Sequence, residues 1–367
     1  MPDTSLTADA IPESMHAVIC HGPENYSLEE VAVPRPGPGE ALVKVEAVGI
    51  CASDLKCYHG ATKFWGDETR PAYAETEVIP GHEFVGRVIQ LDETATERWG
   101  IGVDDRVVSE QIVPCWSCRY CKAGQYWMCG PHAIYGFKRR TPGAMAEYMI
   151  YSSDALVHKV PAELPPAHAA FAEPLSCSLH AVERADIGFD DVVVIAGCGP
   201  IGLGMVAGSK AKGARLVVAL DLDQDKLEVA KACGADLIIN IGTDNAVARV
   251  KELTGGYGAD VYLEGTGHPS AVKQGLDILR KLGTYVEYSV FGSDVTVDWS
   301  IISDDKELDV RGAHLGPHCW PAAIRMLESG SLPMEKICTH QLPLAEFQKG
   351  LDLVGSGTES IKVTLVP

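Results

Sequence analysis

The sequence has no long apolar run, no excess of basic residues, and no repeated or low-complexity segment. No uninterrupted apolar stretch approaches the roughly 20 residues that span a bilayer, so a membrane-spanning protein is not indicated. The N-terminal segment, MPDTSLTADAIPES, lacks the basic start and the apolar stretch of a secretory signal. We interpret it as a disordered or surface-lying extension. Because no export signal is evident, we expect the protein in the cytoplasm.

Basic side chains are scarce, since 31 Lys and Arg stand against 50 Asp and Glu and give a net charge of −19. A field of that sign repels phosphate backbones and anionic lipid surfaces, so nucleic acids and membranes are poor partners. Apolar residues make up 46% and charged residues 22%, as in an ordinary soluble globular protein. A chain of 367 residues exceeds one ordinary core, so we expect two domains.

The pattern of strands and helices changes twice along the chain. Up to about residue 180, short β-rich segments such as ALVKVEAVGI and EFVGRVIQL alternate with turns rich in proline and glycine. From about residue 190, strands such as DDVVVIAG and RLVVALD alternate with helical runs, which predicts parallel βαβ units. After about residue 315, two helices and a final strand return to the first domain. The predicted fold is therefore α/β, with a β-rich domain of residues 1–185 and 316–367 and an inserted doubly wound parallel sheet of residues 186–315.

A glycine turn after the first of these strands predicts a dinucleotide site. The residues GCGPIG, from Gly197 to Gly202, match G-x-G-x-x-G, follow a strand and open a helix. Gly197 permits the turn, Gly199 lets the backbone approach a diphosphate, and Gly202 lets the helix pack on the strand. The helix N-terminus, which begins with Pro200 and Ile201, offers free N–H groups to that diphosphate. The alternative is a tight turn that binds nothing.

Asp221 closes the next strand, 19 residues after Gly202. Its carboxylate can accept hydrogen bonds from both hydroxyls of an adenosine ribose and would repel the additional phosphate of NADP. We therefore predict NAD as the cofactor, while an ordinary surface aspartate remains the alternative.

Twelve cysteines in a long chain without an export signal suggest metal ligands rather than disulfides. Cys115, Cys118, Cys121 and Cys129 form a C-x2-C-x2-C-x7-C array, in a lobe of about residues 112–132. Four thiolates at such spacings suit one tetrahedral Zn²⁺ with no open position, which makes this zinc structural. The spacing differs from the bacterial iron–sulfur pattern, and the acidic charge disfavours a nucleic-acid-binding zinc ribbon. Unliganded thiols are the remaining alternative.

A second zinc site is predicted from dispersed residues: Cys51 in GICASD, His82 and Glu83 in GHE, and Glu173 in AEPLSC. Together they supply sulfur, nitrogen and carboxylate oxygen, a ligand set that suits Zn²⁺ with a vacancy for water or substrate. Because zinc lowers the pKa of bound water to about 7, a bound alcohol should ionise near neutral pH and release hydride to a nicotinamide. Ser53 is placed to take the hydroxyl proton and Asp54 to orient His82, unless both only shape the loop.

These motifs occur in family order over nearly the whole chain, which resembles the zinc-containing medium-chain dehydrogenases. The EPL segment, Glu173 to Leu175, points to their sorbitol dehydrogenase branch. The resemblance implies a GroES-like catalytic domain, a Rossmann domain, NAD, two zinc ions per chain and commonly a homotetramer. It also implies that Cys51 and His82 hold the catalytic zinc together with Glu83 or Glu173, two glutamates that can exchange as the ligand. Lys226 matches a position that contacts the adenosine ribose, and Thr266 completes the predicted cofactor-binding residues.

Departures from the sorbitol branch concern the substrate. Lys56 and Cys57 replace the usual His and Tyr, and Leu315 and Gly316 replace Arg and Tyr, which removes hydrogen-bond donors for a long polyol. The segment before His82 looks long, and its aromatic residues, Phe64, Trp65 and Tyr73, can cap the site. With these changes the chain resembles dehydrogenases that act on shorter polyols. They imply oxidation of a tetritol, such as L-threitol or erythritol, to erythrulose with NAD⁺.

Other functions stay open at this point. Within the same chemistry the alternatives are sorbitol or xylitol, 2,3-butanediol, other secondary alcohols and L-threonine. A different class, a non-enzymatic NAD-binding protein with a structural zinc only, predicts one zinc per chain instead of two.

Overall fold

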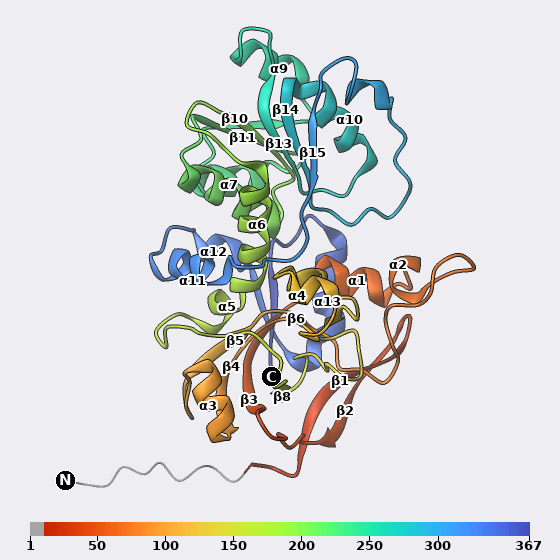
Figure 1. Ribbon diagram of the computed structural model, residues 1–367, viewed down its shortest axis with the longest axis vertical. Helices are drawn as coiled ribbons and strands as arrows, with labels where there is room; N and C mark the ends of the chain where they lie inside the picture. Colours follow the sequence, from red (N-terminus) through yellow and green to blue (C-terminus); the bar gives the residue numbers. More distant parts are fainter. Residues whose placement is uncertain (1–10) are drawn as a thin grey trace, which may run out of the picture. The chain divides into compact units, whose positions relative to one another are not determined.

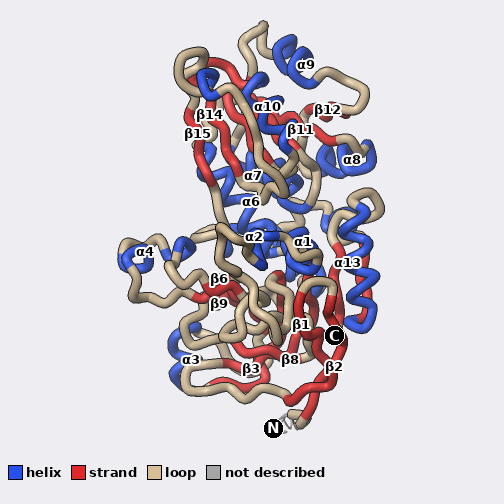
Figure 2. The backbone as a smooth tube through the Cα atoms, turned by 90° about the vertical axis from the view of Figure 1, so that its right-hand side faces the viewer, coloured by secondary structure: helices blue, strands red, loops and turns tan. Residues whose placement is uncertain are grey.

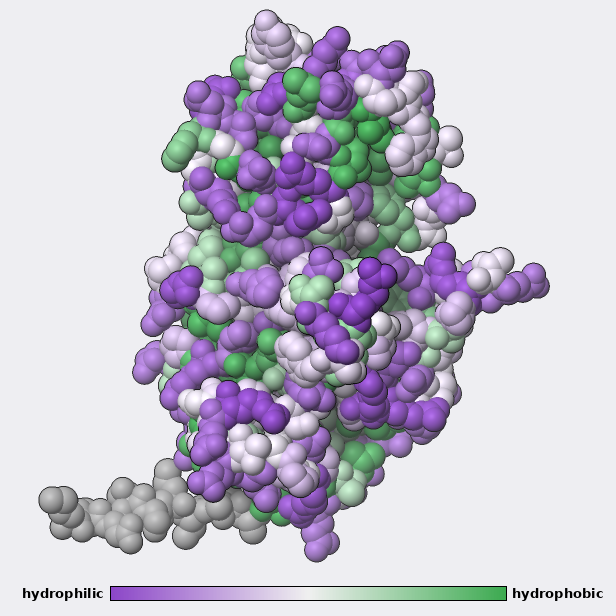
Figure 3. All heavy atoms as spheres, viewed as in Figure 1, coloured by the Kyte–Doolittle hydropathy of each residue, from purple (hydrophilic) through white to green (hydrophobic). Residues whose placement is uncertain are grey.

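The computed structural model describes residues 11–367, which form two compact units (Figure 1). The first unit extends to Ala170 and includes Gln341–Gly355 and Val363–Pro367; the second comprises Phe171–His340 and Ser356–Lys362. Most of the predicted N-terminal extension lies outside the described residues. Polar side chains cover much of the face shown in Figure 3. Among the described helices, none combines the length and apolar character needed to cross a membrane.

The first unit is built on a seven-stranded sheet in the order β16-β17-β3-β4-β5-β9, with β8 also paired to β3. Its strands are β3 (Ala41–Gly49), β4 (Glu83–Leu91), β5 (Arg106–Ser109), β8 (Tyr148–Tyr151), β9 (Val157–Lys159), β16 (His340–Pro343) and β17 (Val363–Val366). The antiparallel pair β3 and β4 places Val43, Val45 and Val88 in one buried cluster, as alternating side chains require. Since β17 pairs with β3, the C-terminal segment returns to this unit.

Smaller elements surround this sheet. The two strand pairs are β1 (Ser14–Gly22) with β2 (Asn25–Ala32), and β6 (Ile112–Val113) with β7 (Ala133–Ile134). The helices are α1 (Ala52–Tyr58), α2 (Thr62–Trp65), α3 (Glu93–Trp99), α4 (Arg119–Lys122), α5 (Pro166–Ala170) and α13 (Phe347–Ser356), with 3₁₀ turns η1 (Tyr126–Met128) and η3 (Leu344–Glu346).

The second unit contains a six-stranded parallel sheet in the order β12-β11-β10-β13-β14-β15. Its strands are β10 (Val192–Ala196), β11 (Leu216–Asp221), β12 (Leu237–Asn240), β13 (Ala259–Glu264), β14 (Leu279–Glu287) and β15 (Asp309–Gly312). This order is that of a doubly wound sheet with two mononucleotide-binding halves, in which the strand order reverses between β10 and β13. Dinucleotides bind at the carboxyl ends of the strands at such a reversal.

The second unit also contains helices, several of which pack against these strands (Figure 2). They are α6 (Ala172–Ala185), α7 (Pro200–Lys212), α8 (Gln224–Ala232), α9 (Ala246–Leu253), α10 (Pro269–Ile278), α11 (Trp320–Glu328) and α12 (Met334–Ile337), with the 3₁₀ turn η2 (Trp299–Ile301). Valine-rich β10 is buried along its whole length, as expected for a strand covered on both faces. The predicted α/β fold class is confirmed.

The compact units and the predicted domains divide the chain at different residues. Compactness groups α6 and residues 316–340 with the parallel sheet, whereas the predicted boundaries after 185 and after 315 assign them to the β-rich domain. Which functional domain these segments serve stays a prediction.

Candidate metal and cofactor sites

Three predicted metal ligands come together in the first unit. The Sγ of Cys51, a ring nitrogen of His82 and a carboxylate oxygen of Glu83 all lie within 4.8 Å of one another. Cys51 caps the N-terminus of α1, while His82 and Glu83 stand at the start of β4. Gly49, opposite Glu83 on β3, makes room for the carboxylate, because a Cβ there would lie 2.2 Å from Glu83 Oε2. Sulfur, nitrogen and oxygen donors in one cluster fit Zn²⁺.

Asp54 holds this cluster together from within α1. Its Oδ2 accepts the N–H of Cys51 at 2.9 Å, and its Oδ1 lies 3.3 Å from Nδ1 of His82. Because Nδ1 faces Asp54, Nε2 is the nitrogen left to bind a metal, and the hydroxyl oxygen of Ser53 lies 3.5 Å from it. Burial lowers the pKa of His82, but Asp54 and Cys51 outweigh burial and raise it well above its usual value. The structure thus brings Ser53 and Asp54 to the predicted place beside His82.

An aromatic wall formed by Phe64, Tyr73 and Phe137 covers His82. The ring of Phe137 lies 5.4 Å from the imidazole of His82, and it packs against Phe64 at 5.3 Å and Tyr73 at 5.8 Å between centroids. The predicted capping residues Phe64 and Tyr73 therefore belong to this wall, while the indole N–H of Trp65 donates to the carbonyl of Cys57 at 2.7 Å. Sequence reasoning missed Phe137, because no local motif marks a residue 55 positions from His82.

Glu173 belongs to the second unit, in the first turn of α6. Its carboxylate is buried and accepts a hydrogen bond from the thiol of Cys177 at 3.4 Å. The predicted place of Glu173 among the zinc ligands stays a prediction. Nearby, Gly316 has a local reason to be glycine, because a Cβ there would lie 2.2 Å from Ser176 Oγ.

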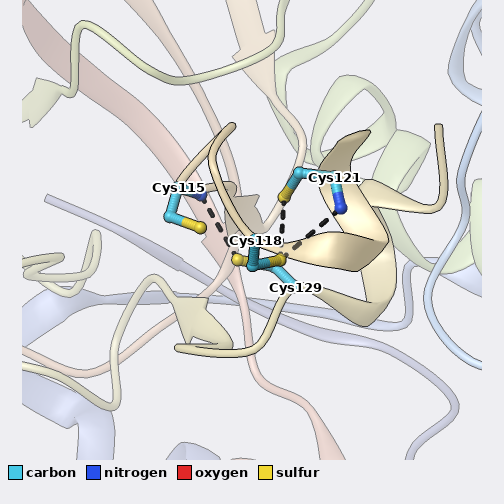
Figure 4. A group of neighbouring side chains, drawn as sticks. All are labelled: Cys115, Cys118, Cys121 and Cys129. Carbon is cyan, nitrogen blue, oxygen red and sulfur yellow. Dashed lines mark hydrogen bonds between the residues drawn. The ribbon is translucent and has the colours of Figure 1, made fainter. Parts of the chain in front are cut away.

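The structure brings the four cysteines of the lobe together. The thiols of Cys115, Cys118, Cys121 and Cys129 lie within 4.8 Å of one another and point toward a common centre (Figure 4). Backbone N–H groups point at the sulfurs: Cys115 N donates to Cys129 Sγ at 3.3 Å, and Cys121 N and Gly130 N donate to Cys118 Sγ at 3.5 and 3.4 Å. Four sulfurs so arranged fit a tetrahedral zinc.

Hydrogen-bond donors around the sulfurs favour the thiolate form of two of these cysteines. The hydroxyl and backbone N–H of Ser117 lower the pKa of Cys115 to about 6, and backbone donors lower the pKa of Cys118. Burial raises the pKa of Cys121 to about 12, so the lobe without metal holds a mixture of thiols and thiolates. A bound cation with charge two would favour the thiolate at every position.

The predicted glycine turn joins β10 to α7. Gly197 has a φ of +90°, and a Cβ at Gly202 would lie 1.8 Å from the carbonyl oxygen of Gly197, so this turn excludes larger residues. Gly199, the N-cap, and Pro200 open α7 with no side-chain cap, which leaves its first N–H groups available to an anion. Among residues 11–367, no atom lies within 4 Å of a Cβ built at Gly199, so the space beside this glycine is open.

Asp221 stands at the end of β11, beside this turn. Its carboxylate accepts the N–H of Cys198 at 2.6 Å and that of Asp223 at 2.9 Å, which fixes its direction. Lys226 donates from Nζ to the carbonyl of Gly357. Thr266, after β13, donates both N–H and O–H to Glu264, a buried acid that the sequence reasoning did not single out.

Two segments of the chain match known domain families. Residues 200–329 match the zinc-binding dehydrogenases and residues 37–162 match the alcohol dehydrogenase GroES-like domain. Together with a full-length relative that is 73% identical, these matches show that the chain belongs to the zinc-binding dehydrogenases and is an enzyme of the zinc-dependent alcohol dehydrogenase type.

Individual relatives narrow the likeness. An erythritol/L-threitol dehydrogenase of Mycolicibacterium smegmatis is 73% identical over 98% of this chain and 99% of its own. A sorbitol dehydrogenase of Halalkalibacterium halodurans is 35% identical over 95% of this chain and 97% of its own. Among solved structures, a putative zinc-binding dehydrogenase of Sinorhizobium meliloti bound to NADP has a TM-score of 0.86 at 28% identity, covering 97% of this chain and all of that one. The resemblance to zinc dehydrogenases is confirmed.

Proposed function

We propose that this protein oxidises a secondary hydroxyl of a tetritol, L-threitol or erythritol, to erythrulose, with NAD⁺ as the hydride acceptor. The main support for a tetritol as the substrate is the 73% identity to an erythritol/L-threitol dehydrogenase along nearly the whole chain. The sulfur, nitrogen and oxygen cluster of Cys51, His82 and Glu83 supports the chemistry.

NAD rather than NADP is favoured by Asp221. The carboxylate is held by two backbone N–H groups at the end of β11, where the adenosine ribose binds in this fold. It accepts ribose hydroxyls in that position, while a ribose phosphate would meet a fixed negative charge. Pro200, Ile201 and the glycines of the turn would hold the diphosphate, with Lys226 at the ribose and Thr266 at the end of β13.

The two ligand groups support the proposal of two zinc ions per chain. Cys115, Cys118, Cys121 and Cys129 would hold a closed structural ion, and Cys51, His82 and Glu83, joined by Glu173, would hold the second. When bound, the second zinc makes a hydroxyl more acidic and the nicotinamide accepts a hydride.

The chain's own residues then have separate tasks. Asp54 fixes the imidazole of His82 from the Nδ1 side, so that Nε2 stays aimed at the ligand cluster. The hydroxyl of Ser53, on the Nε2 side, takes the proton that leaves the substrate oxygen and passes it outward. Glu83, buried beside Gly49, contributes one negative charge that offsets part of the charge of the ion.

The aromatic wall of Phe64, Tyr73 and Phe137 supports a short substrate. Phe137 stacks on Phe64 and makes tilted contacts with Tyr73 and His82, and Phe64 is buried, so the wall is a packed surface. Backbone N–H groups of Tyr73 and Ala74 both donate to the carbonyl of Phe64 at 2.7 Å, which ties the segment to the wall. The hydroxyl of Tyr73 already donates to the carbonyl of His132 at 3.0 Å, and the two phenylalanine rings offer no hydrogen bonds to the extra hydroxyls of a hexitol, which would cost free energy if left unpaired.

The test is a panel of L-threitol, erythritol, xylitol, sorbitol, 2,3-butanediol, 2-propanol and L-threonine, with NAD⁺ and NADP⁺ in parallel. We expect kcat/KM for a tetritol with NAD⁺ to exceed the other substrates by about tenfold or more, equivalent to about 1.4 kcal/mol. A tenfold preference for butanediol would make the tetritol proposal wrong.

Two cysteines supply a matched pair of variants. Cys51→Ser removes a proposed ligand and should abolish oxidation, while Cys233→Ser alters a buried thiol at the end of α8, outside the ligand cluster, and should keep it. If a folded Cys51→Ser variant oxidises its substrate at the wild-type rate, the proposal that a zinc ion at Cys51 takes part in the reaction is wrong. The homotetramer, the cytoplasmic location and a role in carbohydrate metabolism are further parts of the proposal and stay predictions.

A further inference from the structure

Two carboxyl groups lie side by side at the carboxyl edge of the parallel sheet. Glu264 ends β13 and Glu287 ends β14, and the two are register partners on adjacent strands. Glu264 is 0% exposed and Glu287 is partly buried, and the side chains of register partners on parallel strands project to the same face of the sheet. Two carboxyl groups so placed avoid mutual repulsion when one of them carries a proton.

Each member of this pair fastens a turn that follows its strand. Glu264 accepts the N–H of Thr266 at 2.8 Å, the hydroxyl of Thr266, and the N–H of Gly267 at 3.1 Å. Glu287 accepts the N–H of Ser289 at 2.7 Å, and the hydroxyl of Ser289 donates to the carbonyl of Glu264 at 3.4 Å. The two turns, residues 265–267 and 288–290, are therefore connected through the carboxyl pair.

The first of these turns also touches the glycine turn. A Cβ at Gly197 would lie 3.0 Å from Cγ2 of Thr266 and 3.2 Å from the carbonyl oxygen of Gly265. The N–H of Gly265 donates to the carbonyl of Ala196 at 3.0 Å. Since dinucleotides bind at this edge in doubly wound sheets, a shift of residues 265–267 is a shift of the cofactor's surroundings.

The surroundings decide which carboxyl carries the proton. Glu264 accepts hydrogen bonds from three donors of the turn that follows β13. Burial and the charge of Glu264 raise the pKa of Glu287 to about 8. The hydroxyl of Tyr285 also donates to Glu287, at 3.4 Å.

Cationic groups on the adjoining elements are engaged elsewhere. On β15, Arg311 bonds to Asp309 and to the carbonyl of Arg184; on α6, Arg184 donates to the carbonyl of Gly312. On α10, Lys273 pairs with Asp277, and His268 bonds to Ser270. Two further histidines belong to these segments: His180 on α6, whose pKa burial lowers to about 4, and His314, which follows β15.

We propose that Glu264 and Glu287 share one proton, that this pair positions the turns 265–267 and 288–290 for the nicotinamide cofactor, and that loss of the proton weakens cofactor binding. Two ionised carboxylates in contact repel each other and pull the turns apart, and they add negative charge beside an anionic dinucleotide. Glu264 and Glu287 act through the turns and are positioning residues. The inference rests on the proposed use of NAD.

NADH binding, followed by its fluorescence at several pH values, tests the pair directly. For the wild-type protein we expect the Kd to rise about tenfold between about pH 7 and pH 9, as a group with a pKa near 8 loses its proton. Glu287→Gln keeps a neutral donor toward Glu264, so it should bind like the wild type at pH 7 and change by less than about twofold up to pH 9. Glu252→Gln, an exposed change on α9, is the matched control and should follow the wild type.

The outcomes separate the two proposals. If wild type and Glu287→Gln lose affinity for NADH equally as the pH rises, the proposed role of the carboxyl pair is wrong. Weak NADH binding by a folded Glu287→Gln at pH 7 would also contradict it. Absence of any NADH binding by the wild type at pH 7 would overturn the proposed function as well. A measurement without variants uses calorimetry in buffers of different ionisation enthalpy: near pH 8 the wild type should take up protons as NADH binds, and binding without uptake contradicts the inference.

Discussion

The carboxylate of Asp54 serves two neighbours at once. One oxygen caps α1 through the N–H of Cys51, and the other faces Nδ1 of His82. An amide in its place keeps one acceptor, but its NH₂ group cannot accept the imidazole N–H. We therefore expect Asp54→Asn to bind the second zinc about 10- to 100-fold more weakly, the range found for partners of metal-binding histidines.

Competition with a chelator, read as zinc retained per chain, measures this change. Asp92→Asn is the matched control, because Asp92 caps α3 through the N–H of Ala95 and makes no contact with the ligand cluster. If Asp54→Asn and Asp92→Asn retain zinc equally, Asp54 is only a helix cap.

Residues of the site differ in how far the sequence reveals them. The cysteines of the lobe and the glycines of the turn are close in sequence, and their spacing alone predicts the chemistry. Cys51 and His82 were found only as members of a ligand set. The sequence reasoning did not identify Phe137 or the pair of Glu264 and Glu287. Strand register and loop packing bring these residues to their partners, and a single sequence shows neither.

At the scale of elements, the four-cysteine lobe has little core to stabilise it. It consists of one-turn α4, the 3₁₀ turn η1 and the two-residue strands β6 and β7. A metal then replaces packing as the source of order. We expect Cys118→Ser, which removes the sulfur that accepts two backbone N–H groups, to lose one zinc per chain and to lower Tm by about 5 °C or more.

Zinc analysis and thermal unfolding, side by side, check this expectation. Cys233→Ser, at the end of α8, is the control for loss of a buried thiol and should keep both zinc ions. Two zinc ions per chain in folded Cys118→Ser would show that the lobe does not bind one through that thiolate.

Most strands and helices were predictable because their patterns are local. Runs such as VVVIA and LVVALD appear as β10 and β11, and the final helix and strand appear as α13 and β17. The boundaries between domains were harder to predict from the sequence. The helix α6 carries Glu173 of the predicted zinc site, yet it packs on α7 of the parallel sheet, since Gly204 and Gly208 of α7 let Ser178 and Leu179 approach closely.

At the scale of the whole molecule, the parallel sheet has an exposed edge. In the part of the chain that the structure describes, β15 pairs with β14 alone. Val310 on β15 is 47% exposed, and Leu282 and Trp299 are 63% and 72% exposed in the same unit. An open strand edge with apolar side chains tends to pair with another chain, and a second copy of the same chain is always present in solution.

The edge therefore supports the predicted homo-oligomer and shows where to disrupt it. Val310→Lys places a charge on the strand edge, which opposes pairing, while its exposed position spares the fold. By light scattering coupled to size-exclusion chromatography, we expect the wild type at the mass of a tetramer and Val310→Lys at a smaller assembly that still binds NADH. Phe189→Lys, an exposed apolar residue before β10, should leave the mass unchanged. A monomeric wild type would make the prediction of an oligomer wrong, and an unaltered Val310→Lys assembly would place the interface on another surface.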